Sequence, residues 1–226
     1  MTAAMKSAPQ AKNMILGQLY TNEIVDPAVL EALVATDRSI FLPPNFQGAS
    51  YVDDNMDLGN GRCLLAPLTF ARLLHLADIK PSDRVLVLGA LTGYSTAILS
   101  RIAAKVVAIE SDSALLAQAK KHLGGISNIE LHEAASLSEG YSAGAPYDVI
   151  LIEGAINFVP ESLGLQLTEG GRIVTVFRKN NDNALTFGAG RGMLIKRLQA
   201  TLQYREYFDA AAPVLDGFRR ETSFTL

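Results

Sequence analysis

The middle of the chain alternates between short apolar runs and longer segments with helical periodicity. Continuous Val, Ile and Leu runs are typical of strands that are buried on both faces of a parallel sheet. The segments between them repeat apolar residues every three or four positions, which predicts covering helices. The predicted strands are 85–88, 106–109, 129–132, 148–153 and 171–177; the predicted helices are 93–103, 112–123 and one that is capped at Pro160.

Residues 14–83 predict a helical entry region before this alternation. In "VDPAVLEALVATDR", Asp26 is a candidate N-cap and Pro27 takes the first helical position. A second helix is expected in "APLTFARLLHLADI", with Pro67 near its start. The stretch between the two helices is rich in Pro and Gly and predicts an irregular arm.

The pattern changes after Phe177. The segment "NALTFGAGRGMLIKRLQ" predicts two strands joined through Gly188, Gly190 and Gly192, and "ETSFTL" predicts a last strand. These strands are expected to run antiparallel at one edge of the sheet. The polar segment "RKNNDN" at 178–183 is either a mobile lid or an exposed turn.

The fold class that follows is α/β, a mostly parallel sheet with helices on both faces, an N-terminal helical arm and C-terminal antiparallel strands. Residues 1–13 are expected to form a flexible tail and 14–226 a single domain. Within that domain we expect an entry arm (14–83), a ligand-binding core (84–177) and an antiparallel segment (178–226).

Composition narrows the class of protein. Apolar residues make up 49% and charged residues 19% of the chain, which indicates a globular protein, and the net charge of −3 gives no sign of a nucleic-acid or membrane surface. Cys63 is the only cysteine and the N-terminus lacks a signal-peptide pattern, so we expect a cytoplasmic protein. The dispersed His75, His122 and His132 do not predict a metal site.

The stretch "VLVLGALTGYSTA" carries the first candidate chemistry. Gly89 and Gly93 follow a predicted strand and open a helix, at the sheet edge where open α/β sheets bind ligands. A dinucleotide fingerprint would need glycine where the chain has Leu91 and Tyr94, which argues against a nicotinamide reductase. The alternative is a plain strand-to-helix turn that needs glycine only for its backbone conformation.

With Glu110 at the end of the second strand, this arrangement resembles a Rossmann-like S-adenosylmethionine-dependent methyltransferase. The order of further segments is similar to the protein-L-isoaspartate O-methyltransferase family over residues 14–226. The segments that carry the resemblance are "DPAVLEALVATDRSIFLP", "DLGNGRCLLAPLTFARLLHLADIKPSDRVLVLGALTGYSTAILSRIA", "GAPYDVILIEGAINFVPESLGLQLTEGGRIVTV" and "FDAAAPVLDGFRRETSFTL".

The resemblance implies S-adenosylmethionine as the cofactor and assigns parts of it to parts of the chain. The glycine turn would hold the methionine part, Glu110 the ribose hydroxyls, and the loop after the third strand the adenine. Glu110 has a second interpretation, as a strand-end acid or a partner of the N-terminus of helix 112–123. The implied cofactor residues are Gly89, Ala90, Leu91, Gly93, Glu110, Ser111, Ala134 and Ala135.

The chain departs from the family pattern at both ligands. Leu91 replaces a glycine, Val87 an acid and Ala135 an aspartate on the cofactor side, and Leu65 replaces a small hydroxyl residue on the acceptor side. The Leu91 side chain is expected either to occupy ligand space or to be packed away. The implied substrate loop is Leu64, Leu65, Ala66, Pro67 and Thr69.

Two functions follow from this resemblance and these departures. One is methyl transfer from S-adenosylmethionine to a protein or peptide carboxylate, an acceptor that is ionised at neutral pH and needs no general base. The other is a non-catalytic binding or scaffold protein with a degenerate cofactor site. No catalytic residue is assigned. Thr69 and Cys63 are candidates, but Thr69 could simply be a threonine at a helix start and Cys63 a buried cysteine without a catalytic role.

Overall fold

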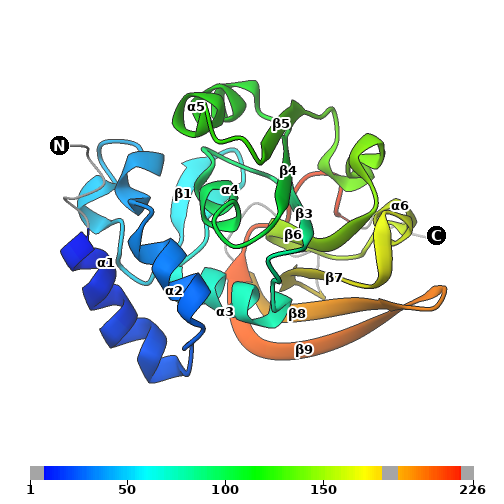
Figure 1. Ribbon diagram of the computed structural model, residues 1–226, viewed down its shortest axis with the longest axis horizontal. Coiled ribbons are helices and arrows are strands. Elements are labelled where there is room, and N and C mark those ends of the chain that lie inside the picture. Colours follow the sequence, from blue (N-terminus) through cyan, green and yellow to red (C-terminus); the bar gives the residue numbers. More distant parts are fainter. Residues whose placement is uncertain (1–7, 180–187, 220–226) are drawn as a thin grey trace, which may run out of the picture.

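The computed structural model describes residues 8–179 and 188–219 and is built around a seven-stranded sheet (Figure 1). The strand order is β5-β4-β3-β6-β7-β8-β9; the first five run parallel, and β8 and β9 are antiparallel to their neighbours. This confirms the predicted α/β class and the antiparallel edge. The strands are β3 (Arg84–Leu88), β4 (Lys105–Glu110), β5 (Ile129–Glu133), β6 (Tyr147–Ile156), β7 (Leu167–Phe177), β8 (Gly188–Leu198) and β9 (Thr201–Ala212).

Helices pack on this sheet and on one another. Helix α3 contacts β7 and β8, α4 contacts β3 and β4, and α5 contacts β4 and β5, while α2 packs on α3 and α4. In the described ranges, no helix has the length and apolar character that a membrane span requires. The helices are α1 (Ala8–Met14), α2 (Pro27–Val34), α3 (Pro67–Ala77), α4 (Tyr94–Leu99), α5 (Ser113–Leu123) and α6 (Glu161–Leu165).

The two helices of the entry region begin where the sequence predicts, for different reasons. Asp26 caps α2, because its side chain accepts a hydrogen bond from the N–H of Ala28 at 2.9 Å. Helix α3 has no side-chain cap at Ala66; instead Asp53, from the preceding arm, accepts the N–H of Leu68 at 3.0 Å. A distant residue therefore satisfies a backbone donor that the local sequence leaves free.

A small separate sheet carries the end of the arm. It consists of β1 (Met56–Gly59) and β2 (Arg62–Leu64), which pair only with each other and form the β1–β2 hairpin. The hairpin turns at Gly59, Asn60 and Gly61, all of which have positive φ. Arg62 therefore directly follows a tight turn, at a position set by the hairpin and not by the main sheet.

Two sequence predictions need correction, and two others lie outside the described residues. Gly188, Gly190 and Gly192 do not join two strands but lie inside β8, which turns into β9 after Leu198 (Figure 1, lower edge). Gly192 is needed there because the Phe208 ring of β9 fills the space a Cβ would take. Residues 8–13 belong to α1 instead of a tail. The predicted strand 221–226 and loop residues 180–183 lie outside the described residues.

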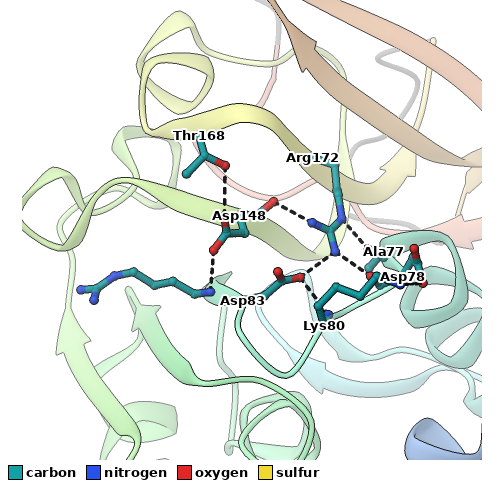
Figure 2. Close-up of polar contacts among 8 residues, drawn as sticks. Ala77, Asp78, Lys80, Asp83, Asp148, Thr168 and Arg172 are labelled. Atoms are coloured by element: carbon teal, nitrogen blue, oxygen red, sulfur yellow. Dashed lines mark hydrogen bonds and ion pairs between the residues drawn. The ribbon is translucent and has the colours of Figure 1, made fainter.

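The amino ends of the central strands are joined by a polar network around Arg172 (Figure 2). Arg172 of β7 binds the carboxylate of Asp83 at 2.7 Å and the backbone oxygens of Ala77 and Asp78 at the end of α3. Asp148 of β6 accepts the N–H of Arg84 at 2.8 Å. This network fixes β3, β6, β7 and α3 against one another at the amino ends of the strands, on the side of the sheet opposite the glycine turn.

Replacing Arg172 with alanine should lower the free energy of unfolding by about 2–4 kcal/mol, because Asp83 loses its charged partner and the carbonyl oxygens of Ala77, Asp78 and Asp148 lose the guanidinium donor. Urea denaturation measures this loss. Lys80→Ala is the matched control: it removes an exposed ion pair with Asp78, which contributes about 0.5 kcal/mol. Equal losses in the two variants would contradict the role given to Arg172.

Candidate functional site

The candidate site lies at the carboxyl ends of β3, β4 and β6. Strand β3 pairs with β4 on one side and with β6 on the other, so the strand order reverses direction beside β3, and open α/β sheets place ligands at the carboxyl end of such a point. Gly89 follows β3, Glu110 ends β4, and Glu153 lies one residue beyond the last pair of β3 with β6. The strand order thus brings together residues that are far apart in the sequence.

The glycine turn after β3 is held by backbone and packing contacts. The N–H groups of Gly89 and Ala90 donate to the Ile109 carbonyl at 3.0 and 3.1 Å. Gly93 has φ +101°, and a Cβ there would lie 2.7 Å from the Leu123 side chain of α5. Gly93 therefore permits close packing of the turn on α5, a role that does not require a ligand.

The Leu91 side chain is buried, and its backbone is in a strained conformation. Its side chain is fully buried in the hydrophobic core and is not among the atoms nearest to a Cβ built on Gly89. Its φ of +52° lies in the left-handed region that side chains avoid, which adds strain to the turn. The Leu91 N–H donates to Glu110 Oε2 at 2.7 Å, which holds the turn in this conformation.

Glu110 is fully buried and its two oxygens are bound by residues of this chain. Arg62 makes a bidentate ion pair with it, Nη1 to Oε1 and Nη2 to Oε2, both at 2.7 Å. Oε1 also accepts the N–H groups of Ser111 at 2.8 Å and Asp112 at 3.0 Å. With the Leu91 N–H, Glu110 receives five hydrogen-bond donors. Two of them come from the residues just before α5, so Glu110 is in part the partner of the α5 N-terminus that the sequence also suggested.

The space in front of the glycines at this edge is filled by side chains. A Cβ on Gly89 would lie 2.7 Å from Arg62 Nη2, and a Cβ on Gly154 of β6 would lie 2.6 Å from the Leu215 side chain. Leu215 belongs to the C-terminal segment, residues 213–219. This segment lies beside β6 and pairs with it through an isolated parallel bridge between Val214 and Ala155. Both glycines therefore lie beneath other parts of the chain.

A cavity of about 210 Å³ lies at this edge between Arg62, Ser111 and the C-terminal segment. Ligand pockets usually begin near roughly 300 Å³. The acceptor atoms of Glu110 are taken and the face of Gly89 is covered, so in this conformation the residues do not fit S-adenosylmethionine. The obstruction is Arg62, a residue that the sequence analysis did not single out.

The remaining cofactor positions expected from the sequence lie around the same edge. The Ser111 hydroxyl is 3.5 Å from Arg62 Nη1. Ala134 donates its N–H to the Glu110 carbonyl at 3.0 Å, and Ala135 is exposed. Ala135 offers no polar side chain, and the following Leu137 is buried beside Gly89.

The expected substrate loop runs from β2 into α3. Leu64, Leu65, Ala66 and Pro67 are buried, and Thr69 is half-buried. The Leu65 carbonyl accepts a hydrogen bond from Nη2 of Arg38 at 2.6 Å. Arg38 is itself fully buried, and its guanidinium lies 5.0 Å from the centre of the Tyr94 ring. The loop is therefore fixed by an arginine of the entry region.

Cys63 is not suited to nucleophilic chemistry. Its side chain is buried between Arg62 and Leu64 in the β1–β2 hairpin, and this burial raises the pKa of the thiol. A thiol in such surroundings stays protonated at neutral pH and is inert. The buried-cysteine interpretation thus describes this residue.

Glu153 is a second buried acid that the sequence analysis did not single out. Its Oε2 accepts a short hydrogen bond from the Ser95 hydroxyl of α4. Among the described residues, its Oε1 has no hydrogen-bond partner. Burial raises the pKa of Glu153 to about 7, although Ser95 and Arg38 act in the opposite direction. An acid inside the apolar run "DVILIEGAI" was the signal that could have identified it.

The fold and this edge define the class of protein. The parallel order β5-β4-β3-β6-β7, a glycine turn after β3 and an acid at the end of β4 are the features of a Rossmann-like methyltransferase. In the described part of the chain, no group of three or more His, Cys, Asp or Glu residues is arranged to hold a metal ion.

Sequence comparison identifies the family. The profile of Protein-L-isoaspartate(D-aspartate) O-methyltransferase (PCMT) matches residues 10–200. A protein-L-isoaspartate O-methyltransferase of Methanoregula boonei is 38% identical over 77% of this chain and 81% of its own length. A second, from Rhodopseudomonas palustris, is 34% identical over 76% and 70%. The chain belongs to the protein-L-isoaspartate O-methyltransferase family, which confirms the resemblance.

Solved structures agree with this at the level of the fold. A protein-L-isoaspartate O-methyltransferase matches with a TM-score of 0.77 and 23% identity, over 92% of this chain and 66% of the other. A Plasmodium falciparum structure, described as a putative member in complex with S-adenosyl-L-homocysteine, matches with a TM-score of 0.70 and 17% identity, over 92% and 97%.

Glu153 predicts a pH dependence of stability. The pKa of its carboxyl is about 7 in the folded chain, against an ordinary 4.5, so the unfolded chain loses its proton at lower pH. Stability from this group is fully present below pH 4.5 and is lost as pH rises to about 7, a loss of about 3 kcal/mol. Urea denaturation at pH 5 and pH 8 should show that Glu153→Gln removes this loss. The control Glu31→Gln, at an exposed position, should keep the wild-type loss of stability between pH 5 and pH 8. The same loss in Glu153→Gln would contradict the assignment.

Proposed function

We propose that this chain is an S-adenosylmethionine-dependent carboxyl methyltransferase that acts on isoaspartyl residues of proteins or peptides. The observation that carries the proposal is the family match, which includes the substrate loop, the glycine turn and Glu110 in one ordered block. The names of its relatives supply the acceptor.

The chemistry makes modest demands on the protein. When bound, the cofactor supplies an activated methyl group, and a carboxylate acceptor is already ionised at neutral pH. The chain's own task is to position the acceptor and exclude water. On this proposal, residues 14–83 form the acceptor side, 84–177 the cofactor side and 178–226 the antiparallel edge. Because the described conformation does not fit the cofactor, a conformational change must precede binding.

A second candidate function is a non-catalytic binding or scaffold protein of the same family. It is favoured by the contacts that fill the cofactor edge, Arg62 on Glu110 and Leu215 on Gly154. Leu65 adds to it, because a buried leucine cannot hydrogen-bond an acceptor carboxylate. The two candidates differ in whether the chain transfers a methyl group, and a degenerate site also predicts that the chain does not bind the cofactor.

Methyl-ester formation tests the first candidate. The full chain, incubated with methyl-labelled S-adenosylmethionine and an isoaspartyl peptide, should produce a base-labile methyl ester, and the matched L-aspartyl peptide should not be labelled. Calorimetric titration with S-adenosylhomocysteine completes the test. No ester, together with no heat or thermal shift at millimolar ligand, would reject the methyltransferase proposal and support the non-catalytic one.

A further inference from the structure

We propose that Arg62 is an internal occupant of the cofactor site: its guanidinium takes the place of ribose hydroxyls on Glu110 and sets how tightly this chain binds its cofactor. The identity of the ligand rests on the proposed function. The occupancy itself rests on the contacts of Arg62.

The first argument is the hydrogen-bonding capacity of Glu110. A carboxylate offers about four lone-pair positions, and Glu110 already receives five donors, two of them from Arg62. Ribose hydroxyls have no free acceptor while the guanidinium is present. Without Arg62, the N–H groups of Leu91, Ser111 and Asp112 would still hold the carboxylate, and Oε2 would keep only one donor.

The second argument is space. Arg62 Nη2 lies against the open face of Gly89, where a Cβ would come within 2.7 Å of it. This is the face that allows close approach of a ligand to the backbone in such turns. Arg62 therefore blocks both the polar anchor and the contact surface of the same site, whereas the buried Leu91 side chain is not among the atoms nearest to the open face of Gly89.

The third argument is the element that carries Arg62. It lies in the β1–β2 hairpin, whose strands pair only with each other. The turn of the hairpin consists of the exposed Gly59 and Asn60 and the half-buried Gly61. Withdrawal of Arg62 from Glu110 would therefore break no hydrogen bond of the seven-stranded sheet. The site is closed by a side chain on a separate hairpin, and the frame of the site stays in place when that side chain leaves.

Calorimetric titration of S-adenosylhomocysteine into the full-length chain tests the proposal. Arg62→Ala should bind at least tenfold more tightly than the wild type, because it frees Glu110 and the face of Gly89. Arg62→Lys keeps the charge with a single donor group, so its affinity should lie between those of the wild type and Arg62→Ala. It replaces the alanine variant in the test if that variant does not fold. Leu91→Gly alone should not tighten binding.

Arg172→Ala is the matched control, since it also removes an arginine paired with a carboxylate, at the opposite edge of the sheet. Titrated well below its melting temperature, it should bind as the wild type does. If folded Arg62 variants bind no more tightly than the wild type, or if Arg172→Ala gains equally, the proposal is overturned.

The outcomes separate this inference from the proposed function. Tighter binding in Arg62→Ala without methyl-ester formation by any variant supports the internal occupant and rejects the methyltransferase. Ester formation with equal affinities in wild type and Arg62→Ala supports the methyltransferase and overturns the internal occupant. Absence of binding in both folded Arg62 variants and of ester in the wild type rejects both.

Discussion

The bidentate ion pair between Arg62 and Glu110 joins three parts of the chain that lie far apart in the sequence. Arg62 comes from the β1–β2 hairpin, Glu110 ends β4, and the Leu91 N–H ties the turn after β3 to the same carboxylate. The entry region, the glycine turn and the start of α5 are thus fixed through one buried group. The state of the cofactor edge depends on this pair.

Such a pair is costly to bury unless each charge is fully bonded. Glu110 meets this condition through three backbone donors and the guanidinium. The backbone donors come from the turn after β3 and the start of α5, where the proposed function places the cofactor. A site built to position a carboxylate for a ligand is therefore equally able to hold that carboxylate for an arginine.

Much of the fold could be predicted from the sequence, because apolar runs and helix caps act locally. The strand 85–88 and the cap at Asp26 are examples, and both depend on residues within a few positions. The sequence predicts a turn at the glycines of β8, whereas the structure places them inside a strand. Gly192 is required there because the Phe208 ring of the neighbouring strand leaves no room for a Cβ. Local patterns do not report such contacts across a sheet.

The candidate site was predictable in its positions but not in its contacts. The glycine spacing and Glu110 marked the edge, and Leu91 was recognised as unusual. The partner of Glu110 lies 48 residues away in sequence, on a hairpin whose placement depends on the folded arm. Arg62 carries no local signal beyond a Gly-Asn-Gly turn before it, so its role emerges only from the tertiary structure.

The central claim is that Arg62 and Glu110 are paired in the folded chain, and a double-mutant cycle measures this directly. The free energies of unfolding of the wild type, Arg62→Ala, Glu110→Gln and the double variant give the coupling between the two side chains. The account predicts a coupling of about 2 kcal/mol or more. Additivity of the two single substitutions within about 0.5 kcal/mol would contradict it.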